Sequence, residues 1–304
     1  MSRKVEFTIV DVFTAQPFGG NQLAVFIDAA ALMPSEMQAL AREMNFSEST
    51  FVTAAEIPGA MRRVRIFTPQ RELPMAGHPT VGTTWVLATR GEIALDSACV
   101  DATLQLGIGP VTVSVENSNG KPAFVWMTHR GAEFGAIRRD RARIAKALGI
   151  AAADIRDDLP IQIASTGVPF IFVPLKTLDA LARCAPNEAA LCTLFSAGET
   201  RLPVHMFVVN ESGEFGVRAR MFAPHTDGIP EDPATGGAAA PFGAYAAQHG
   251  LIDPAHAVFT ISQGVEMGRP SDIRVQVTRK HDGALAIRIG GQCAIVASGE
   301  FTLE

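Results

Sequence analysis

Two short stretches decide the fold of this chain: Arg65-Ile66-Phe67-Thr68-Pro69 and, 155 residues later, Arg220-Met221-Phe222-Ala223-Pro224. The same spacing, without a gap, pairs Thr80 with Thr235. Each copy continues through a turn rich in Gly, Pro and Thr into a run of small and apolar residues. Self-similarity at half the chain length is typical of two like domains made by duplication, not of a solenoid with many repeats.

The hydrophobic pattern predicts many short strands and few helices. Short apolar runs predict strands at residues 5–12, 21–26, 50–54, 64–68, 111–115, 168–173 and 203–209. Helices are expected at residues 34–44, 80–88 and 237–248. Each half is therefore mostly strand with one or two helices, which indicates an α+β fold of two pseudosymmetric lobes, each a rolled sheet or barrel around a central helix. We expect an N-terminal lobe of residues 1–128, completed by 290–304, and a C-terminal lobe of 129–289.

Composition and charge exclude several classes of partner. The 304 residues are 47% hydrophobic and 19% charged, with a net charge of −5. Nucleic acids and anionic membranes attract clustered Lys and Arg, so we expect neither as a partner. The one basic cluster, residues 138–143, is interpreted as a solvated helix face. The chain has no run of about 18 apolar residues, which predicts no membrane span, and no signal-peptide pattern, which predicts a cytoplasmic protein.

The metal-binding and redox residue types are dispersed. No two of the cysteines form a C-x-x-C pair, so we expect buried, reduced thiols: Cys99, Cys184, Cys192 and Cys293. Four of the seven histidines are interpreted as polar loop residues: His225, His249, His256 and His281. Nucleotide-binding glycine motifs and metalloprotease motifs are absent from the sequence. The sequence therefore predicts no metal site.

The two Gly/Pro/Thr-rich turns each precede a helix and each contain a titratable residue, His78 and Asp232. The start of a helix presents free backbone N–H groups and the positive end of the helix dipole, so it can bind a carboxylate. The alternative interpretation is that both turns only cap and pack their helices. Two matching turns with titratable residues favour an anion-binding role in both lobes.

Glu48 is the candidate acid or base. It lies between the predicted helix ending near Met44 and an apolar strand, close to Phe46 and Phe51. A carboxyl group in apolar surroundings has a raised pKa, which suits a group that takes up and returns a proton. The alternative is a capping or surface glutamate.

Six blocks in this order resemble the PhzF family of phenazine-biosynthesis-like proteins over nearly the whole chain. The blocks are residues 11–14, 20–25, 46–50, 67–80 (with Ala-Gly-His-Pro-Thr at 76–80), 231–236 (Glu-Asp-Pro-Ala-Thr-Gly) and 263–271. The resemblance implies the diaminopimelate-epimerase-like fold, with an active site between two lobes. It also implies a cofactor-free isomerase of a small organic acid, commonly a homodimer. The family's founding activity moves a proton along the ring of trans-2,3-dihydro-3-hydroxyanthranilate.

The same resemblance assigns roles to residues. The glutamate that takes and returns the proton corresponds to Glu48, and the family's histidine and aspartate correspond to His78 and Asp232. The remaining predicted substrate-binding residues are Asn21, Gly77, Thr80, Thr235, Gly236 and Gly237. Of these, the three glycines would supply backbone N–H donors. Gly237 departs from the family, which has serine at this position, and this leaves the anthranilate-type substrate open.

Two alternative functions are carried forward. One is a racemase or epimerase of the related fold, which places two cysteine thiols at the two helix starts, where this chain has His78 and Asp232. The other is a non-catalytic protein that binds a small acid. An anion-binding protein has no need of two additional carboxylates, so the combination of Glu48 with Asp232 disfavours it.

Overall fold

The computed structural model describes residues 3–129, 131–195, 200–210, 214–223, 229–255 and 257–303. Pro224, His225 and His256, which the sequence singled out, lie outside these residues. The chain divides into two compact units: unit 1 comprises Met1–Thr128 and Ile289–Glu304, and unit 2 comprises His129–Arg288.

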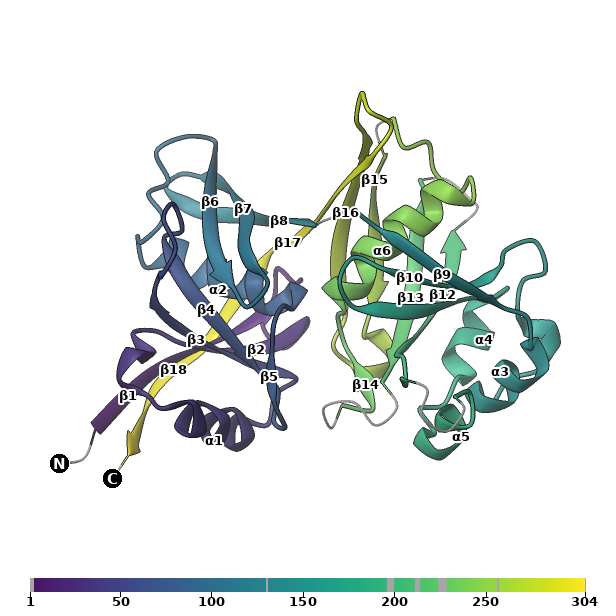
Figure 1. Ribbon diagram of the computed structural model, residues 1–304, viewed down its shortest axis with the longest axis horizontal. Coiled ribbons are helices and arrows are strands. Elements are labelled where there is room, and N and C mark those ends of the chain that lie inside the picture. Colours follow the sequence, from purple (N-terminus) through teal and green to yellow (C-terminus); the bar gives the residue numbers. More distant parts are fainter. Residues whose placement is uncertain are drawn as a thin grey trace. The chain divides into compact units, whose positions relative to one another are not determined.

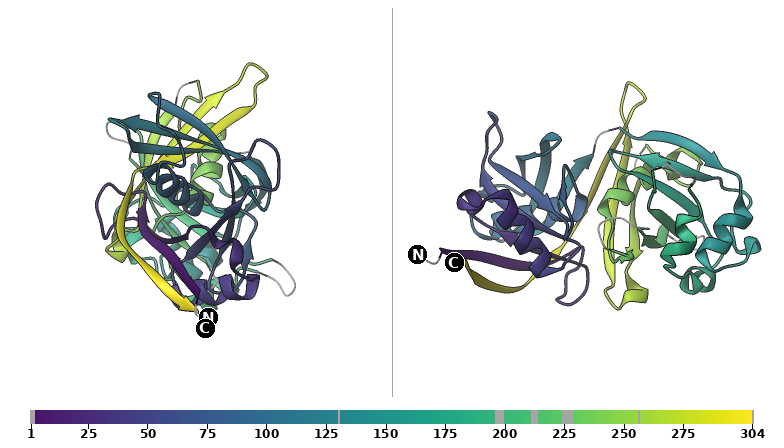
Figure 2. Two further views of the ribbon diagram at one scale, coloured as in Figure 1. Left: turned by 90° about the vertical axis from the view of Figure 1, so that its left-hand side faces the viewer. Right: turned by 60° about the horizontal axis from the view of Figure 1, so that its bottom comes forward.

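Unit 1 is a sheet wrapped around one helix. Its strands are hydrogen-bonded in the order β18-β1-β2-β3-β4-β6-β7-β8, with the short β5 paired to β4. Figures 1 and 2 show β1 and β18 running side by side. The elements are β1 (Arg3–Val12), β2 (Asn21–Phe26), η1 (Ala29–Ala31), α1 (Pro34–Met44), β3 (Glu48–Ala54), β4 (Arg62–Phe67), β5 (Glu72–Leu73), α2 (Gly77–Thr89), β6 (Cys99–Leu106), β7 (Gly109–Ser118), β8 (Lys121–His129) and β18 (Cys293–Leu303).

Two helices cover the unit 1 sheet. Eleven of the 13 residues of α2 are buried, and the helix packs against β1, β2, β3 and β7. A helix that is apolar around its whole circumference belongs in a core. The other helix, α1, buries Met37, Leu40 and Ala41, as i, i+3 and i+4 periodicity predicts. These residues pack with Phe26 and Phe51, whose rings stack with centroids 4.7 Å apart.

Unit 2 has the same plan with additional helices. Its strand order is β9-β10-β11-β12-β13-β15-β16, and the short β14 pairs with β13. Figure 1 shows α6 on one side of this sheet and α3, α4 and α5 on the other. The elements are β9 (Glu133–Arg138), α3 (Arg141–Leu148), η2 (Ala152–Asp154), β10 (Ile161–Ser165), β11 (Pro169–Pro174), α4 (Leu178–Arg183), α5 (Glu188–Cys192), β12 (Val204–Asn210), β13 (Gly216–Phe222), β14 (Glu231–Asp232), α6 (Gly236–Gln248), β15 (Ala257–Gln263), η3 (Val265–Met267), β16 (Ser271–Arg279) and β17 (Leu285–Gly291).

The connections of the two units match strand for strand. In unit 1, β2 and β3 pair in parallel, β3 and β4 antiparallel, and β4 and β6 in parallel. In unit 2, β11 and β12, β12 and β13, and β13 and β15 repeat these three relations in the same order. Each unit therefore encloses its own central helix with the same strand plan. The predicted α+β fold of two similar lobes is confirmed.

The predicted register between the copies is wrong beyond the first strand of the repeat. Phe67 pairs with Glu72 in unit 1, and Phe222 pairs with Glu231 in unit 2, so the second loop is four residues longer. The spacing is 155 residues up to these strands and 159 residues after them, because α2 begins at Gly77 and α6 at Gly236. Thr235 is therefore the residue before α6, whereas Thr80 is the fourth residue of α2, and the two are not equivalent.

Helix number and helix bounds also differ from the prediction. Unit 2 contains four α-helices among its described residues, not one or two as predicted. The hydrophobic pattern did not predict α3, α4 and α5 because these helices have only eight, six and five residues. The basic cluster at 138–143 spans the end of β9 and the start of α3, so it is not a single helix face. The central helix of unit 1 begins at Gly77, not Thr80, since proline is tolerated in a first turn such as the one containing Pro79.

No helix within the described part of the chain combines the length and the apolar character needed to cross a membrane.

Candidate functional site

The unit 1 site begins at the turn between β1 and β2. Gly20 has a φ of +62°, and a Cβ at this position would lie 2.3 Å from the Val12 carbonyl oxygen. Only glycine fits this backbone. The turn places Asn21 as the first residue of β2, where it is 1% exposed.

Three predicted residues meet at the start of α2. The Asn21 Nδ2 atom lies 3.2 Å from Nδ1 of His78, and the opposite ring nitrogen, Nε2, lies 3.5 Å from a carboxylate oxygen of Glu48. Glu48 is the first residue of β3 and pairs with Leu23 of β2, so the parallel strands bring Asn21 and Glu48 to the same end of the sheet. The structure thus joins two predicted catalytic residues with one predicted substrate-binding residue.

His78 is a buried and neutral imidazole. Its side chain is 4% exposed, while that of Glu48 is 14% exposed. Burial lowers the pKa of His78 to about 3, against a smaller opposing effect of the Gln22 backbone. Nδ1 of the neutral ring lies beside the Asn21 amide and Nε2 faces the Glu48 carboxylate, and the tautomer decides which of the two nitrogens donates. Nε2 makes no hydrogen bond within the described ranges, so this nitrogen remains available to a proton or a ligand beside Glu48.

The helix starts in both units keep their backbone N–H groups uncapped by side chains. Considering only the described residues, neither Ala76 before α2 nor Thr235 before α6 accepts a capping hydrogen bond with its side chain. Gly77 and His78 therefore begin α2, and Gly236 and Gly237 begin α6, at ends where N–H groups and the helix dipole favour an anion.

Thr80 is engaged inside its own helix. Its hydroxyl donates to the Ala76 carbonyl oxygen at 2.7 Å, and the residue is fully buried. The structure therefore places the hydroxyl of Thr80 on the backbone of α2 and not on Asn21, His78 or Glu48.

The unit 2 site is a hydrogen-bonded turn between β14 and α6. Asp232 is 7% exposed, and its carboxylate accepts from the hydroxyl of Thr235 at 2.6 Å. Gln263, the last residue of β15, also bonds to this turn. Within the described ranges, a Cβ at Gly237 would meet the Phe170 ring alone, at 3.7 and 3.9 Å. The structure brings together the predicted Asp232, Thr235, Gly236 and Gly237, and it adds Gln263, which the sequence analysis did not assign to the site.

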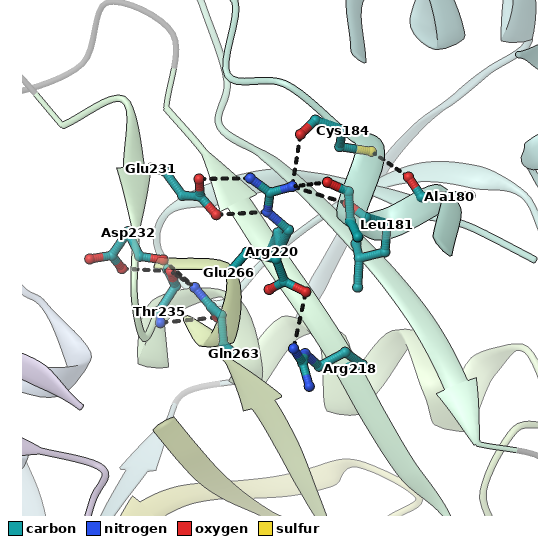
Figure 3. A network of polar contacts seen from close by, with 11 residues as sticks. Ala180, Leu181, Cys184, Arg218, Arg220, Glu231, Asp232, Thr235, Gln263 and Glu266 are labelled. Atoms are coloured by element: carbon teal, nitrogen blue, oxygen red, sulfur yellow. Dashed lines mark hydrogen bonds and ion pairs between the residues drawn. The ribbon is translucent and has the colours of Figure 1, made fainter. Parts of the chain in front are cut away.

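A pair of matching salt bridges braces both sites, and the sequence analysis missed them. Arg65 binds both carboxylate oxygens of Glu72 at 2.8 and 2.7 Å, and Arg220 binds both oxygens of Glu231 at 2.8 and 2.9 Å. Figure 3 shows the second pair next to Asp232. The detectable signal was the arginine that begins each copy of the repeat. Because Glu231 directly precedes Asp232, its salt bridge holds the backbone of that residue.

The cysteines do not lie at the helix starts. Cys184 is buried, and burial raises the pKa of its thiol to about 11. Burial also raises the pKa of the Cys293 thiol. Cys99 is exposed in β6, contrary to the expectation of buried thiols, and Cys192 ends α5. With the helices starting at Gly77 and Gly236, the two-thiol racemase alternative has no thiol in the required places.

Comparison with known proteins identifies the family. The family described as "Phenazine biosynthesis-like protein" matches residues 10–299. A trans-2,3-dihydro-3-hydroxyanthranilate isomerase of Pseudomonas fluorescens is 36% identical over 301 residues, covering 98% of this chain and 99% of the relative. An uncharacterised isomerase of Mesorhizobium japonicum is 35% identical over 300 residues, covering 97% of each chain.

Solved structures agree with this relationship. A PhzF family protein of Bacillus anthracis superimposes with a TM-score of 0.87 at 28% identity, covering 98% of this chain and 99% of that one. A hydroxyproline epimerase of Agrobacterium vitis has a TM-score of 0.67 at 13% identity, covering 99% and 93%, which extends the similarity in fold alone. The predicted resemblance is confirmed. The chain belongs to the phenazine biosynthesis-like (PhzF) family of isomerases and has the fold shared with the epimerases of the diaminopimelate-epimerase-like group.

Proposed function

We propose that this isomerase moves a proton between two carbon atoms of a small carboxylated substrate, with Glu48 as the group that takes up and returns the proton. The observation that supports the proposal most strongly is the buried His78 Nε2 atom, which faces the Glu48 carboxylate at 3.5 Å. The substrate class is that of trans-2,3-dihydro-3-hydroxyanthranilate, the compound named for the relative from Pseudomonas fluorescens.

The proposed chemistry balances without an external reagent. The Glu48 carboxylate removes a proton from an acidified carbon, and the electron pair of the broken C–H bond passes into an adjacent double bond of the substrate. The same carboxyl group then delivers the proton to the far end of that conjugated system, which regenerates the carboxylate. Neutral His78, whose Nδ1 lies beside the Asn21 amide, faces Glu48 with Nε2 and positions the carboxyl group during both steps.

The remaining predicted residues bind the substrate in this proposal. The N–H groups of Gly77, Gly236 and Gly237 bind its anionic group, and Asp232 accepts hydrogen bonds from its amino or hydroxyl group. As the family resemblance implies, the enzyme needs no cofactor and works as a cytoplasmic homodimer. The isomerase relatives give no support to the alternative of a protein that only binds a small acid.

Solvent deuterium incorporation tests the proposal. Wild-type protein is incubated in D₂O with a panel of small cyclic and amino acids, and label uptake is read by mass spectrometry. Glu48→Gln should lower label uptake by at least about 10³-fold, because the amide cannot accept the proton. Circular dichroism and ligand binding should stay close to wild type.

Glu56→Gln is the matched control, since Glu56 is an exposed glutamate of unit 1 paired with Arg63. It should exchange label at the wild-type rate. Exchange by Glu48→Gln at the wild-type rate would show that another group moves the proton.

A further inference from the structure

The side-chain amide of Gln263 uses all of its hydrogen-bonding groups on one turn. Its Nε2 donates to the Asp232 carbonyl oxygen at 2.7 Å and to the Thr235 hydroxyl at 3.0 Å. Its Oε1 accepts from the Thr235 backbone N–H at 3.3 Å. Gln263 is fully buried, and Figure 3 shows its amide between Asp232 and Thr235. The amide therefore spans the two ends of the turn that leads into α6.

These contacts fix the direction of the hydrogen bond that Asp232 receives. An amide nitrogen can only donate, so the Thr235 oxygen must accept from Gln263. The single proton of the Thr235 hydroxyl is then directed to the Asp232 carboxylate, at 2.6 Å. The result is a chain of donors that runs from Gln263 through Thr235 to Asp232.

Unit 1 builds the same turn without such an amide. The sheet register makes Leu106 the equivalent of Gln263: Arg62 pairs with Leu104 in unit 1, and Val217 pairs with Ile261 in unit 2. The glycine that follows contacts the equivalent proline in both units. A Cβ on Gly107 would lie 2.8 Å from the Cα of Pro74, and a Cβ on Gly264 would lie 2.5 Å from the carbonyl oxygen of Pro233.

The same register makes Leu73 of unit 1 the equivalent of Asp232, because Leu73 pairs with Ile66 and Asp232 pairs with Met221. A leucine pair, Leu73 with Leu106, therefore suffices for this turn, and a buried glutamine is not required for the fold. In unit 2 both members of the pair are polar and are linked through Thr235.

We infer that Gln263 is a positioning residue for the reaction: through the Thr235 hydroxyl it holds the Asp232 carboxylate in its productive orientation. This inference rests on the proposed function of Asp232. Loss of the amide leaves the Thr235 hydroxyl free to donate to a backbone carbonyl, as Thr80 does in α2, and Asp232 then loses a fixed donor. Small displacements of this kind lower turnover much more than they weaken substrate binding.

A double-mutant cycle tests the inference. Gln263→Leu should lower kcat by about 10- to 100-fold and change KM by less than about threefold. In an Asp232→Asn background the same substitution should change kcat by less than about twofold, because the residue acts through Asp232. Equal losses of kcat in both backgrounds, or wild-type kcat in Gln263→Leu, would overturn the assignment.

Gln162→Leu is the matched control. Gln162 is another buried glutamine of unit 2, bonded to His249 at 2.8 Å and to the Gly135 carbonyl oxygen. It should keep wild-type kcat.

Gln263→Glu supplies a second variant of nearly the same shape for the case in which the leucine variant does not fold. A carboxylate cannot donate to Thr235, so this variant should lose kcat at least as strongly, and wild-type kcat here would also overturn the assignment.

Hydrogen exchange separates this inference from the proposed function. The Thr235 amide is bonded to Gln263, so its exchange, followed by NMR without substrate, should speed up by about tenfold or more in Gln263→Leu and stay unchanged in Gln162→Leu. Failure of the wild-type protein to incorporate deuterium into any substrate would refute the proposed function. Unchanged exchange of the Thr235 amide in Gln263→Leu would refute the inference that Gln263 holds this turn in place.

Discussion

The starts of α2 and α6 share one scaffold and differ in which positions are polar. Unit 1 has Leu73 and Leu106 where unit 2 has Asp232 and Gln263, and it has His78 where unit 2 has Gly237. Glu48 also has no acidic counterpart: Ser49 and Val204 are equivalent in register, so Glu48 corresponds to Pro203.

The difference between the units teaches that the duplicated backbone and the chemistry are separable. Among the described residues, both helix starts lack a side-chain cap from the preceding residue and both have an Arg–Glu salt bridge, and these features belong to the scaffold. The residues proposed for proton transfer, Glu48 and His78, lie in unit 1, and the Asp232 carboxylate, linked to Gln263 through Thr235, lies in unit 2.

Among the substitutions that compare the two units, the largest effect is expected at the helix start of unit 1. His78→Gln keeps a polar side chain but removes the imidazole that faces Glu48, and turnover should fall by about 10²-fold. Steady-state kinetics with the substrate identified by deuterium incorporation measure this loss. His249→Gln in unit 2 is the matched control and should keep wild-type turnover, since the ring of His249 bonds Gln162, which has no part in the proposed reaction. Equal losses in both variants would remove the distinction between the two units.

Acid stability probes the core of unit 2. His205 is fully buried against the rings of Phe172 and Phe242, and burial lowers its pKa to about 3. Below an unfolded-state pKa of about 6.5, the unfolded chain binds a proton that the folded chain does not, so stability falls as the pH drops from about 6.5 toward 3. The loss for such a residue is about 1.4 kcal/mol per pH unit.

His205→Phe should therefore weaken the decrease in stability between pH 7 and pH 4.5, measured by urea unfolding at the two values. His281→Phe is the control, because His281 lies in an exposed turn and its change should leave the decrease as it is. An identical decrease in wild type and His205→Phe would contradict the assignment of a neutral, buried imidazole.

Leu106→Gln tests whether the polar pair of unit 2 can be transplanted. In unit 1 the new amide lacks the threonine hydroxyl that Gln263 bonds, because Ala76 precedes α2 where Thr235 precedes α6, and the amide replaces a buried apolar side chain. The free energy of unfolding should therefore fall by about 1–3 kcal/mol. Thermal or urea unfolding measures the change, and Leu106→Met, which keeps the volume, should cost less. A glutamine variant as stable as wild type would mean that either residue serves this turn, and the contrast with Gln263 would then say nothing about the site.

The smallest effect is expected at Gly237. Among the described residues, a Cβ at Gly237 would meet the Phe170 ring at ordinary contact distance, so Gly237→Ser should fold normally. It should leave turnover of trans-2,3-dihydro-3-hydroxyanthranilate unchanged or raise it. The increase would correspond to one additional hydrogen bond to the substrate, which lowers the activation free energy by roughly 1 kcal/mol. Gly243→Ser in the same helix is the contrast, because its Cβ would lie 2.9 Å from Val277 and should destabilise the protein. A marked loss of turnover in Gly237→Ser would indicate a substrate of different shape.

The sequence was sufficient for the repeated fold and for the cluster of Asn21, Glu48 and His78. The two strands that define the repeat end in the same pattern, Arg65-Ile66-Phe67 and Arg220-Met221-Phe222. Alternating apolar residues indicate the other strands. The change of register after these strands could not be predicted from the sequence. The four additional residues come between β13 and β14, where the sequence has no hydrophobic periodicity that an insertion would interrupt.

The missed elements have physical explanations of the same kind. Helices α3, α4 and α5 are too short to show a 3.6-residue period, although Asp140, Thr177 and Asn187 cap them through their side chains. Gln263 bonds to residues 28 and 31 positions earlier in the chain, and only the folded sheet brings these partners together. A glutamine at the end of a strand gives no such information by itself.

The salt bridge of Arg220 has a consequence for engineering this enzyme. Besides Glu231, the guanidinium binds the carbonyl oxygens of Leu181, Ala182 and Cys184 at the end of α4. The segment between β11 and β12 is thus anchored to the residue next to Asp232. Shortening or exchanging that segment in a designed variant should disturb turnover even though its helices contribute no reacting group, unless three carbonyl acceptors are rebuilt in the same positions.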